Sequence, residues 1–266
     1  MANERPDPLD LTVPRDFSTL LSATLRIFGR HAEVFLTAAL IFVTPVTLLV
    51  DGVWGRALAE GIDASAPVEA DGVSAGLRVF VILPLVTAMN VVIVQGLAHG
   101  TTPTVGWALR TAARRLPPVV GAVTLYVLGV MAGFVALIVP GIWLAVRWYF
   151  AAQAVVIDGV GPGEALRRSS QLVKGTWWRT AGMLLGTGLL FAFAGSIVVA
   201  ILGALGSAPV YVAGLILVEA VAVSLSGIFG TLLFFDLRAR RGDREAGADP
   251  AGDGLDAPER PDAGVR

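Results

Sequence analysis

The segment Val119–Ile157 reads VVGAVTLYVLGVMAGFVALIVPGIWLAVRWYFAAQAVVI, and it contains one charged residue, Arg147. As a single helix it would be about 58 Å long at ~1.5 Å per residue, nearly twice the ~30 Å hydrocarbon core of a bilayer. The segment must therefore turn back, and Pro140-Gly141 is the point at which we expect the turn. The sequence predicts two membrane-spanning helices here, Val119–Val139 and Gly141–Ile157.

The composition of the whole chain agrees with a membrane protein. Hydrophobic residues make up 55% of the 266 residues and charged residues only 15%, where an average soluble domain has about 25% charged residues. Such a chain has too little polar surface to cover a water-soluble globule, which excludes a soluble enzyme. Cysteine is absent and there are two histidines, His31 and His99, so we expect neither a metal site nor a cofactor.

Four further apolar stretches have the length that a membrane helix needs. They are Val34–Val50, Val79–Ala98, Thr180–Gly203 and Val210–Phe235. We therefore predict an all-α, polytopic membrane protein with six transmembrane helices in residues 33–238. Residues 1–32 are expected to form a cytoplasmic segment with an amphipathic helix, and residues 239–266, which have little apolar bulk, a disordered cytoplasmic tail.

The basic residues are divided unequally between the two sides of these six helices. Four arginines precede the first helix, three basic residues follow the second, four follow the fourth and six follow the last, which places seventeen of twenty on one side. The opposite side has only Arg56 and Arg78, while Arg147 lies within a span. Because lysine and arginine mark cytoplasmic loops, we expect a cell-membrane protein with both termini in the cytoplasm. The net charge of −1 argues against a nucleic-acid partner.

Each basic segment also has the pattern of a helix that lies on the membrane surface. Apolar residues recur at helical spacing after Asp16, after Thr104 and after Gly161-Pro162-Gly163, and the last of these helices is expected to end at Gly175. The unit of surface helix, span and span thus occurs three times, which suggests a weak internal repeat.

Several short motifs resemble a known family, the glycerophosphoryl diester phosphodiesterase membrane-domain family of bacterial multi-pass proteins. The matching pieces are Gly106-x-Ala108-x-x-x-Ala112-x-Arg114-Arg115-Leu116, Pro140-Gly141-Ile142, Val155-Val156-Ile157, Ala165-Leu166-x-Arg168-Ser169 with Leu172, Gly175 and Trp178, and Phe235-Asp236-Leu237-Arg238-x-Arg240. The resemblance implies a multi-pass membrane protein. Some members are fused to a catalytic barrel for which this chain has no room, so we do not expect phosphodiesterase activity.

Two groups of residues are candidates for a functional site. Polar side chains within the predicted spans are costly and often mark a pathway, and here they are Asn90, Gln95, Arg147, Gln153 and Glu219. We expect Arg147 to pair with Glu219; in the alternative, Arg147 points outward beside Trp143 and Trp148, and Glu219 is protonated or bonded to Asn90. The basic surface helices predict binding of anionic lipid phosphate through Arg114, Arg115, Arg167 and Arg168.

Two hypotheses about function remain from the sequence. The first is a non-enzymatic membrane module that scaffolds or modulates a membrane-protein partner or the bilayer; the alternative is a transporter of a small solute or a lipid. A continuous polar cavity that joins the five intramembrane residues would favour transport. A dry interior packed through glycine would favour the scaffold, and Gly129-x-x-x-Gly133 and Gly182-x-x-x-Gly186 are expected to serve packing within the chain more than dimerisation.

Overall fold

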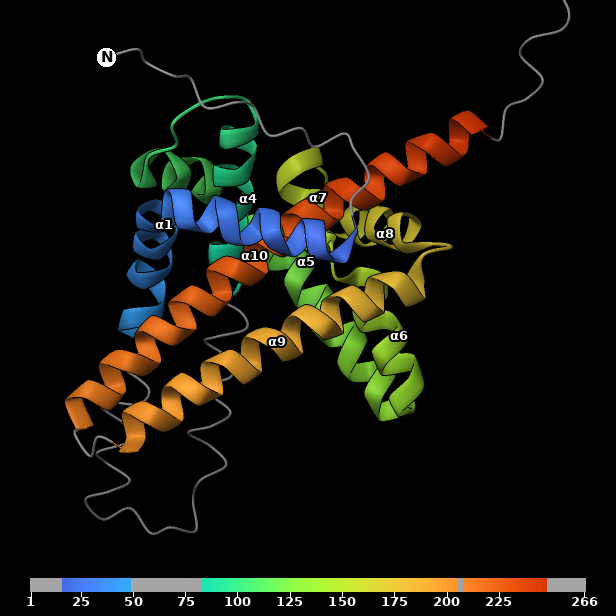
Figure 1. Ribbon diagram of the computed structural model, residues 1–266. Coiled ribbons are helices and arrows are strands. Elements are labelled where there is room, and N and C mark those ends of the chain that lie inside the picture. Colours follow the sequence, from blue (N-terminus) through green and yellow to red (C-terminus); the bar gives the residue numbers. More distant parts are fainter. Residues whose placement is uncertain (1–15, 49–82, 205–207, 248–266) are drawn as a thin grey trace, which may run out of the picture.

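The computed structural model describes residues 16–48, 83–204 and 208–247, and every regular element in these ranges is a helix. The helices are α1 (Phe17–Thr47), α4 (Leu83–Ala98), α5 (Val105–Ala136), α6 (Ile138–Trp148), α7 (Ala151–Asp158), α8 (Pro162–Val173), α9 (Trp177–Ala204) and α10 (Ala208–Gly247) (Figure 1). The all-α prediction is therefore confirmed.

Within the described ranges, five helical segments are long and apolar enough to cross a membrane. They are Phe17–Pro45, Val105–Ala136, Ile138–Asp158, Trp177–Ala204 and Val210–Gly242. The apolar part of α4, Pro84–Ala98, is shorter, and the predicted second span begins at Val79, outside the described residues. The chain is a polytopic, membrane-embedded helical protein, with five helical segments of spanning length where the sequence predicted six.

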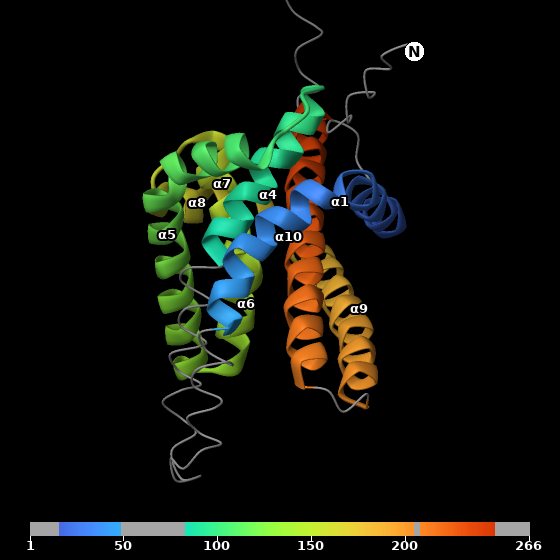
Figure 2. The same cartoon turned by 90° about the vertical axis from the view of Figure 1, so that its left-hand side faces the viewer.

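The basic segments of the long helices lie toward one end of the molecule in the view of Figure 2. Figure 2 shows α5, α9 and α10 nearly upright, with the C-terminal ends of α5 and α9 below, and with α8 and the C-terminal end of α10 above. Helix α10 packs mainly on α1 and α9, and α5 packs mainly on α6 and α4. Phe35 of α1, Met89 of α4, Phe229 of α10 and Phe150, in the turn between α6 and α7, are fully buried and form the core between these groups.

Two predicted surface helices continue directly into the spans that follow them. In α1 the backbone departs from helical geometry at His31 (φ −128°, ψ 27°), close to the predicted boundary, but the helix resumes and runs to Thr47. In α5 the helix runs through Pro117 and Pro118 without ending. A proline in a helix removes one backbone hydrogen bond and bends the helix, and the chain on either side can stay helical.

The predicted turn at Pro140-Gly141 is wrong by a few residues. The chain turns at Leu137, whose backbone is extended (φ −168°, ψ 155°), and α6 begins at Ile138. Pro140 is tolerated in the first turn of α6, because its missing N–H has no partner there anyway. Gly141 allows the two helices of the hairpin to pack closely. A Cβ on Gly133 would lie 3.0 Å from the Cα of Gly141, and a Cβ on Gly141 would overlap the ring of Phe134.

The fourth predicted span is broken between α6 and α7, and a serine of α8 bonds the free backbone groups at the break. Ser169 Oγ accepts a hydrogen bond from the backbone N–H of Phe150 (3.1 Å) and donates one to the carbonyl of Arg147 (2.8 Å). Helix α8 begins at Pro162 after the N-cap Gly161, two residues earlier than the start expected after Gly163, and Gly175 follows it with a positive φ of 81°.

The prediction of a disordered tail from residue 239 is wrong for its first part. Helix α10 continues to Gly247, and residues 248–266 lie outside the described residues. The helix continues because its arginines find acidic partners: Arg238 pairs with Asp158 and Arg240 with Asp236. The prediction of disorder followed from the low apolar content of these residues, and composition does not reveal such ion pairs.

Candidate functional site

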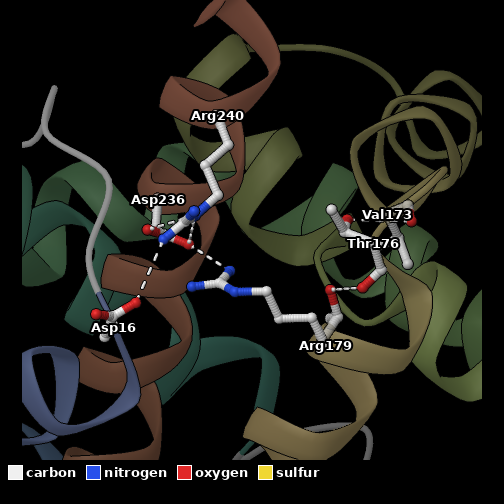
Figure 3. Close-up of polar contacts among 7 residues, drawn as sticks. Asp16, Val173, Thr176, Arg179, Asp236 and Arg240 are labelled. Carbon is white, nitrogen blue, oxygen red and sulfur yellow. Dashed lines mark hydrogen bonds and ion pairs between the residues drawn. The ribbon is translucent and has the colours of Figure 1, made fainter. Parts of the chain in front are cut away.

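A cluster of ion pairs around Asp236 joins three helices at the basic end (Figure 3). Asp236 is buried, and its Oδ2 accepts a hydrogen bond of 2.7 Å from Nη1 of Arg179, in the first turn of α9. Both carboxylate oxygens also accept from Nε of Arg240, one turn further along α10, at 3.2 Å. Nη2 of Arg240 lies 3.9 Å from Asp16, which precedes α1. One carboxylate therefore holds the starts of α1 and α9 against α10.

The segment before Arg179 is fixed by hydrogen bonds of its own. Figure 3 shows the hydroxyl of Thr176 directed at the carbonyl of Val173, to which it donates a hydrogen bond of 3.3 Å. The hydroxyl of Thr180 donates in turn to the carbonyl of Thr176 at 3.0 Å. These bonds bridge the short turn between α8 and α9, so the position of Arg179 relative to α8 is well determined.

A second ion-pair cluster neutralises the arginines of α8. Asp158, at the end of α7, lies 3.1 Å from Nη1 of Arg168 and 2.9 Å from Nη1 of Arg238. Glu164 accepts hydrogen bonds from Arg168 and Arg167, which hold the pKa of its carboxyl below the ordinary value. Hydrogen bonds to Asp158 and Glu164 raise the pKa of Arg168. Of the four arginines predicted to bind lipid phosphate, Arg167 and Arg168 thus already have carboxylate partners.

The arginines of α5 are in a different situation. Arg110, Arg114 and Arg115 are exposed, and they form no ion pair within the part of the chain that the structure describes. The guanidinium of Arg115 lies over Gly159, where a Cβ would be 2.9 Å from Nη1. Gly159 also has a φ of 69°, so both the backbone and the close approach of Arg115 require glycine there.

A pocket of about 400 Å³ lies beside these arginines, between the end of α4 and the start of α5. Its walls include Gln95, His99, Trp107 and Arg115. The chain is held in a tight turn below it, because Thr101 Oγ1 donates to the carbonyl of Gly96 at 2.7 Å. Gln95 and Arg115, which the sequence placed in two separate candidate groups, therefore come together in one pocket. It presents a cation, an amide and an indole, groups suited to a lipid head group at the membrane interface.

Two other predicted polar residues lie against glycines of α10. Asn90 is buried and its Nδ2 donates to the carbonyl of Val223 at 3.4 Å. A Cβ on Gly227 would overlap the Asn90 amide, and a Cβ on Gly230 would lie 3.3 Å from Nε2 of Gln153. The side-chain oxygens of Asn90 and Gln153 are both buried without a hydrogen-bond partner among the described residues.

The predicted pair between Arg147 and Glu219 does not form. The guanidinium of Arg147 stacks on the ring of Trp143, 4.4 Å from its centroid, and Glu219 Oε2 accepts a hydrogen bond from Thr47 at 3.3 Å. The placement of Arg147 beside Trp143 agrees with the alternative prediction, whereas Asn90 bonds Val223 and not Glu219. The prediction was based only on the depths of the two residues along their helices. The two helices have different neighbours: α6 packs mainly on α5 and α8, and α10 mainly on α1 and α9.

The five intramembrane candidates are spread over different places. Gln95 lines the pocket beside α5, Gln153 lines a second cavity deeper in the membrane domain, and Arg147 and Glu219 contact Trp143 and Thr47. The first glycine motif packs inside the chain, since a Cβ on Gly129 would overlap Trp148.

Asp16, Asp158, Arg179 and Asp236 are the site residues that the sequence reading missed. The sequence pattern identified the basic residues of the surface helices, but it does not show which acidic residues pair with them. One signal was available: Asp236 is a single acid directly after the apolar run of the last span and directly before Arg238 and Arg240. A carboxylate at that depth needs a cation.

Comparison with known proteins identifies a family but no function. No curated protein and no solved structure gives a significant match to the chain. The model of one family, described as a domain of unknown function (DUF7847), matches residues 18–239. That range includes α5, α8, α9 and the ion pairs Arg168–Asp158 and Arg179–Asp236. The chain belongs to the DUF7847 family.

Proposed function

We propose that the protein is a non-enzymatic membrane module that binds anionic lipid at its basic end and holds a membrane partner or the bilayer there. The proposal rests on the contrast between the two sets of arginines. The α8 arginines have carboxylate partners, whereas Arg110, Arg114 and Arg115 are exposed and form no ion pair within the described ranges. We place this end on the cytoplasmic side of the cell membrane, following the charge asymmetry of the sequence.

Electrostatics supports lipid phosphate as the partner of these arginines. Each lysine or arginine near an anionic membrane surface contributes on the order of 1 kcal/mol to binding, and the contribution decays over a Debye length. An arginine that already has a carboxylate partner contributes less, because its charge is compensated. Arg110, Arg114 and Arg115 should therefore dominate the interaction with anionic lipid.

The pocket beside α5 adds a specific contact to this general attraction. Arg115 offers a planar, bidentate donor of the kind that suits phosphate. Gln95 and Thr111 line the same pocket and offer hydrogen bonds to the hydroxyls of a glycerol head group, and Trp107, 45% exposed, has the amphipathic character typical of interfacial residues. Phosphatidylglycerol is the common anionic lipid that has both features.

The interior supports a scaffold more than a transporter. Its helices approach closely through Gly129, Gly133, Gly141 and Gly227. The polar residues predicted to line a pathway have separate neighbours, and the wall of the cavity beside Gln153 is mainly apolar. A conduit for a solute would need these groups to face one continuous aqueous space.

The experiment is to purify the full chain from its host membrane and to measure the co-purified lipids by mass spectrometry. The variant Arg110→Gln/Arg114→Gln/Arg115→Gln should retain far less phosphatidylglycerol than the wild type, with neutral lipid unchanged. The control Glu164→Gln/Arg168→Gln removes an ion pair without changing the net charge, and it should retain close to the wild-type amount. Equal loss in both variants, or loss in neither, would contradict the proposal.

A further inference from the structure

A cavity of about 300 Å³ lies within the helical domain, and its lining includes Trp148, which is bonded to Ser170 of α8. Figure 2 shows α4 between α5 and α10, and residues of these three helices and of α7 line the cavity. Its floor includes buried Val123 and Gln153, while Thr87, Tyr126 and Ser226 at other walls are half-buried. The volume is at the lower end of the ~300–1,000 Å³ usual for ligand sites. It therefore suits the head and the first part of a chain of a lipid, not a whole lipid.

Gln153 is the most unusual residue of this cavity. It is 4% exposed, it lines the cavity, and its Oε1 has no hydrogen-bond partner among the described residues. Leaving a buried amide unpaired is costly, and the cost is greater in a membrane interior, where there is little water. Oε1 is enclosed, but rotation of the amide about its last side-chain torsion exchanges Oε1 and Nε2, and a ligand hydroxyl in the cavity would then donate to Oε1.

The other lining residues define the rest of the ligand. Thr87, Tyr126, Tyr149 and Ser226 add hydroxyl groups, and the remaining walls are mainly alanine and valine. None of the described lining residues is charged. A phosphate or a carboxylate would be left without a counter-charge in a region of low dielectric, which is strongly unfavourable. A pure hydrocarbon would leave the Gln153 amide unpaired.

We propose that this cavity binds a neutral lipid that has a free hydroxyl group, with the hydroxyl at Gln153 and the acyl chains extending into the bilayer. Diacylglycerol belongs to this chemical class. The site is independent of the anionic-lipid interface: it uses none of the arginines of α5, and it lies on other walls of α4 and α5 than the pocket of Gln95 and Arg115.

The test uses photo-crosslinking of the purified full chain in detergent with a diacylglycerol whose acyl chain has a diazirine. Peptides that contain residues 151–157 and 222–230 should be labelled. Unlabelled 1,2-dioleoylglycerol should compete, whereas its 3-acetyl ester, in which the hydroxyl is blocked, should compete roughly tenfold less well, the loss expected for one buried hydrogen bond. Equal competition by the two lipids would overturn the assignment of the hydroxyl to Gln153.

A set of variants separates this site from lipid that merely surrounds the protein. Gln153→Leu should lower labelling about tenfold, as for the blocked lipid, and should raise the melting temperature, because it removes an unpaired amide. Thr187→Val is the matched control: it also removes a buried, unpartnered polar atom from a span, but Thr187 does not line the cavity. Ala222→Phe fills the cavity from the α10 side and should also lower labelling, which keeps the test valid if Gln153→Leu fails to fold. The proposal would be overturned if labelling is unchanged in Gln153→Leu, or in Ala222→Phe if only that variant folds. Labelling that is spread along α9 would also overturn it.

Discussion

Oδ2 of Asp236 on α10 lies 2.7 Å from Nη1 of Arg179 on α9, and the Asp236 side chain is only 1% exposed. The two residues are 57 positions apart in the sequence, and the helices that carry them form an antiparallel pair (Figure 2). Their ion pair, together with the contacts of Arg240, fixes the basic end of that helical pair. Helix α5, on which we place lipid binding, has other neighbours and packs mainly on α6 and α4.

We expect Arg179→Met to destabilise the protein strongly, because it leaves a buried carboxylate with less compensation. Breaking a buried pair by removing one partner costs about 3–5 kcal/mol, and the second partner, Arg240, should keep the loss near the lower value. The combined variant Arg179→Met/Asp236→Asn should recover much of the loss. Thermal unfolding in detergent measures both variants against the wild type.

The double-mutant cycle decides whether Arg179 and Asp236 are coupled. Asp236→Asn alone completes the cycle. If the losses of Arg179→Met and Asp236→Asn simply add in the double variant, the pair does not stabilise the fold.

The long apolar helices could be predicted from the sequence because membrane spans are decided by local composition, which any window of the chain reveals. The ends of helices were harder. The turn at Leu137 depends on how Gly133, Phe134 and Gly141 pack against one another, and the end of helix α10 is supported by Arg238, which pairs with Asp158 of α7, and by Arg240, which pairs with Asp236 one turn earlier. The Arg238–Asp158 contact joins residues 80 positions apart and leaves no local pattern, and the shorter contacts depend on packing that composition does not reveal.

The candidate site divides in the same way. Arg115, Gln95 and Gln153 were identified because a basic or polar residue near an apolar run is a local anomaly. Their surroundings were not predictable: that Arg115 and Gln95 share one pocket follows from the packing of α4 on α5. The expected Arg147–Glu219 pair was wrong because a count of helical rise gives depth but does not identify neighbouring helices.

Glycine packing within the α5–α6 hairpin gives a second prediction. Gly129→Ala should destabilise the protein by about 1–3 kcal/mol, because the added methyl group overlaps the indole of Trp148. Gly182→Ala is the matched control, since nothing lies within 4 Å of a Cβ there. It should be neutral or stabilising by about 0.5–1 kcal/mol through helix propensity. Destabilisation by Gly182→Ala in thermal unfolding would indicate that α9 uses its glycines against a second copy.

The carboxyl of Glu164 gives a third prediction, on pH. Hydrogen bonds from Arg168 and Arg167 lower its pKa from 4.5, so folding favours the ionised form. The stabilising contribution is therefore complete above pH 4.5 and is lost as the pH falls through the lowered pKa. At neutral pH we expect Glu164→Gln to melt below the wild type, with the difference vanishing in acid. A difference that grows on acidification has the opposite sign and would contradict the pairing.

The orientation in the membrane gives a fourth prediction. The natural chain has no cysteine, so single cysteines report each side without background. An impermeant maleimide added to intact cells should label Ser65→Cys, and it should label Gly242→Cys only after the membrane is opened. Gly242 is exposed and nothing lies within 4 Å of it, so the thiol there is accessible. The reverse pattern would put the basic end outside the cell.

Direct titration of phosphatidylglycerol tests anionic-lipid binding by the α5 arginines most directly. Native mass spectrometry of the purified full chain in a neutral detergent measures the affinity for that lipid in each variant. The account predicts a loss of at least about tenfold for Arg110→Gln/Arg114→Gln/Arg115→Gln, from charges that contribute on the order of 1 kcal/mol each. It predicts little change for Glu164→Gln/Arg168→Gln, which leaves the net charge unchanged. Wild-type affinity in the α5 variant would contradict the account.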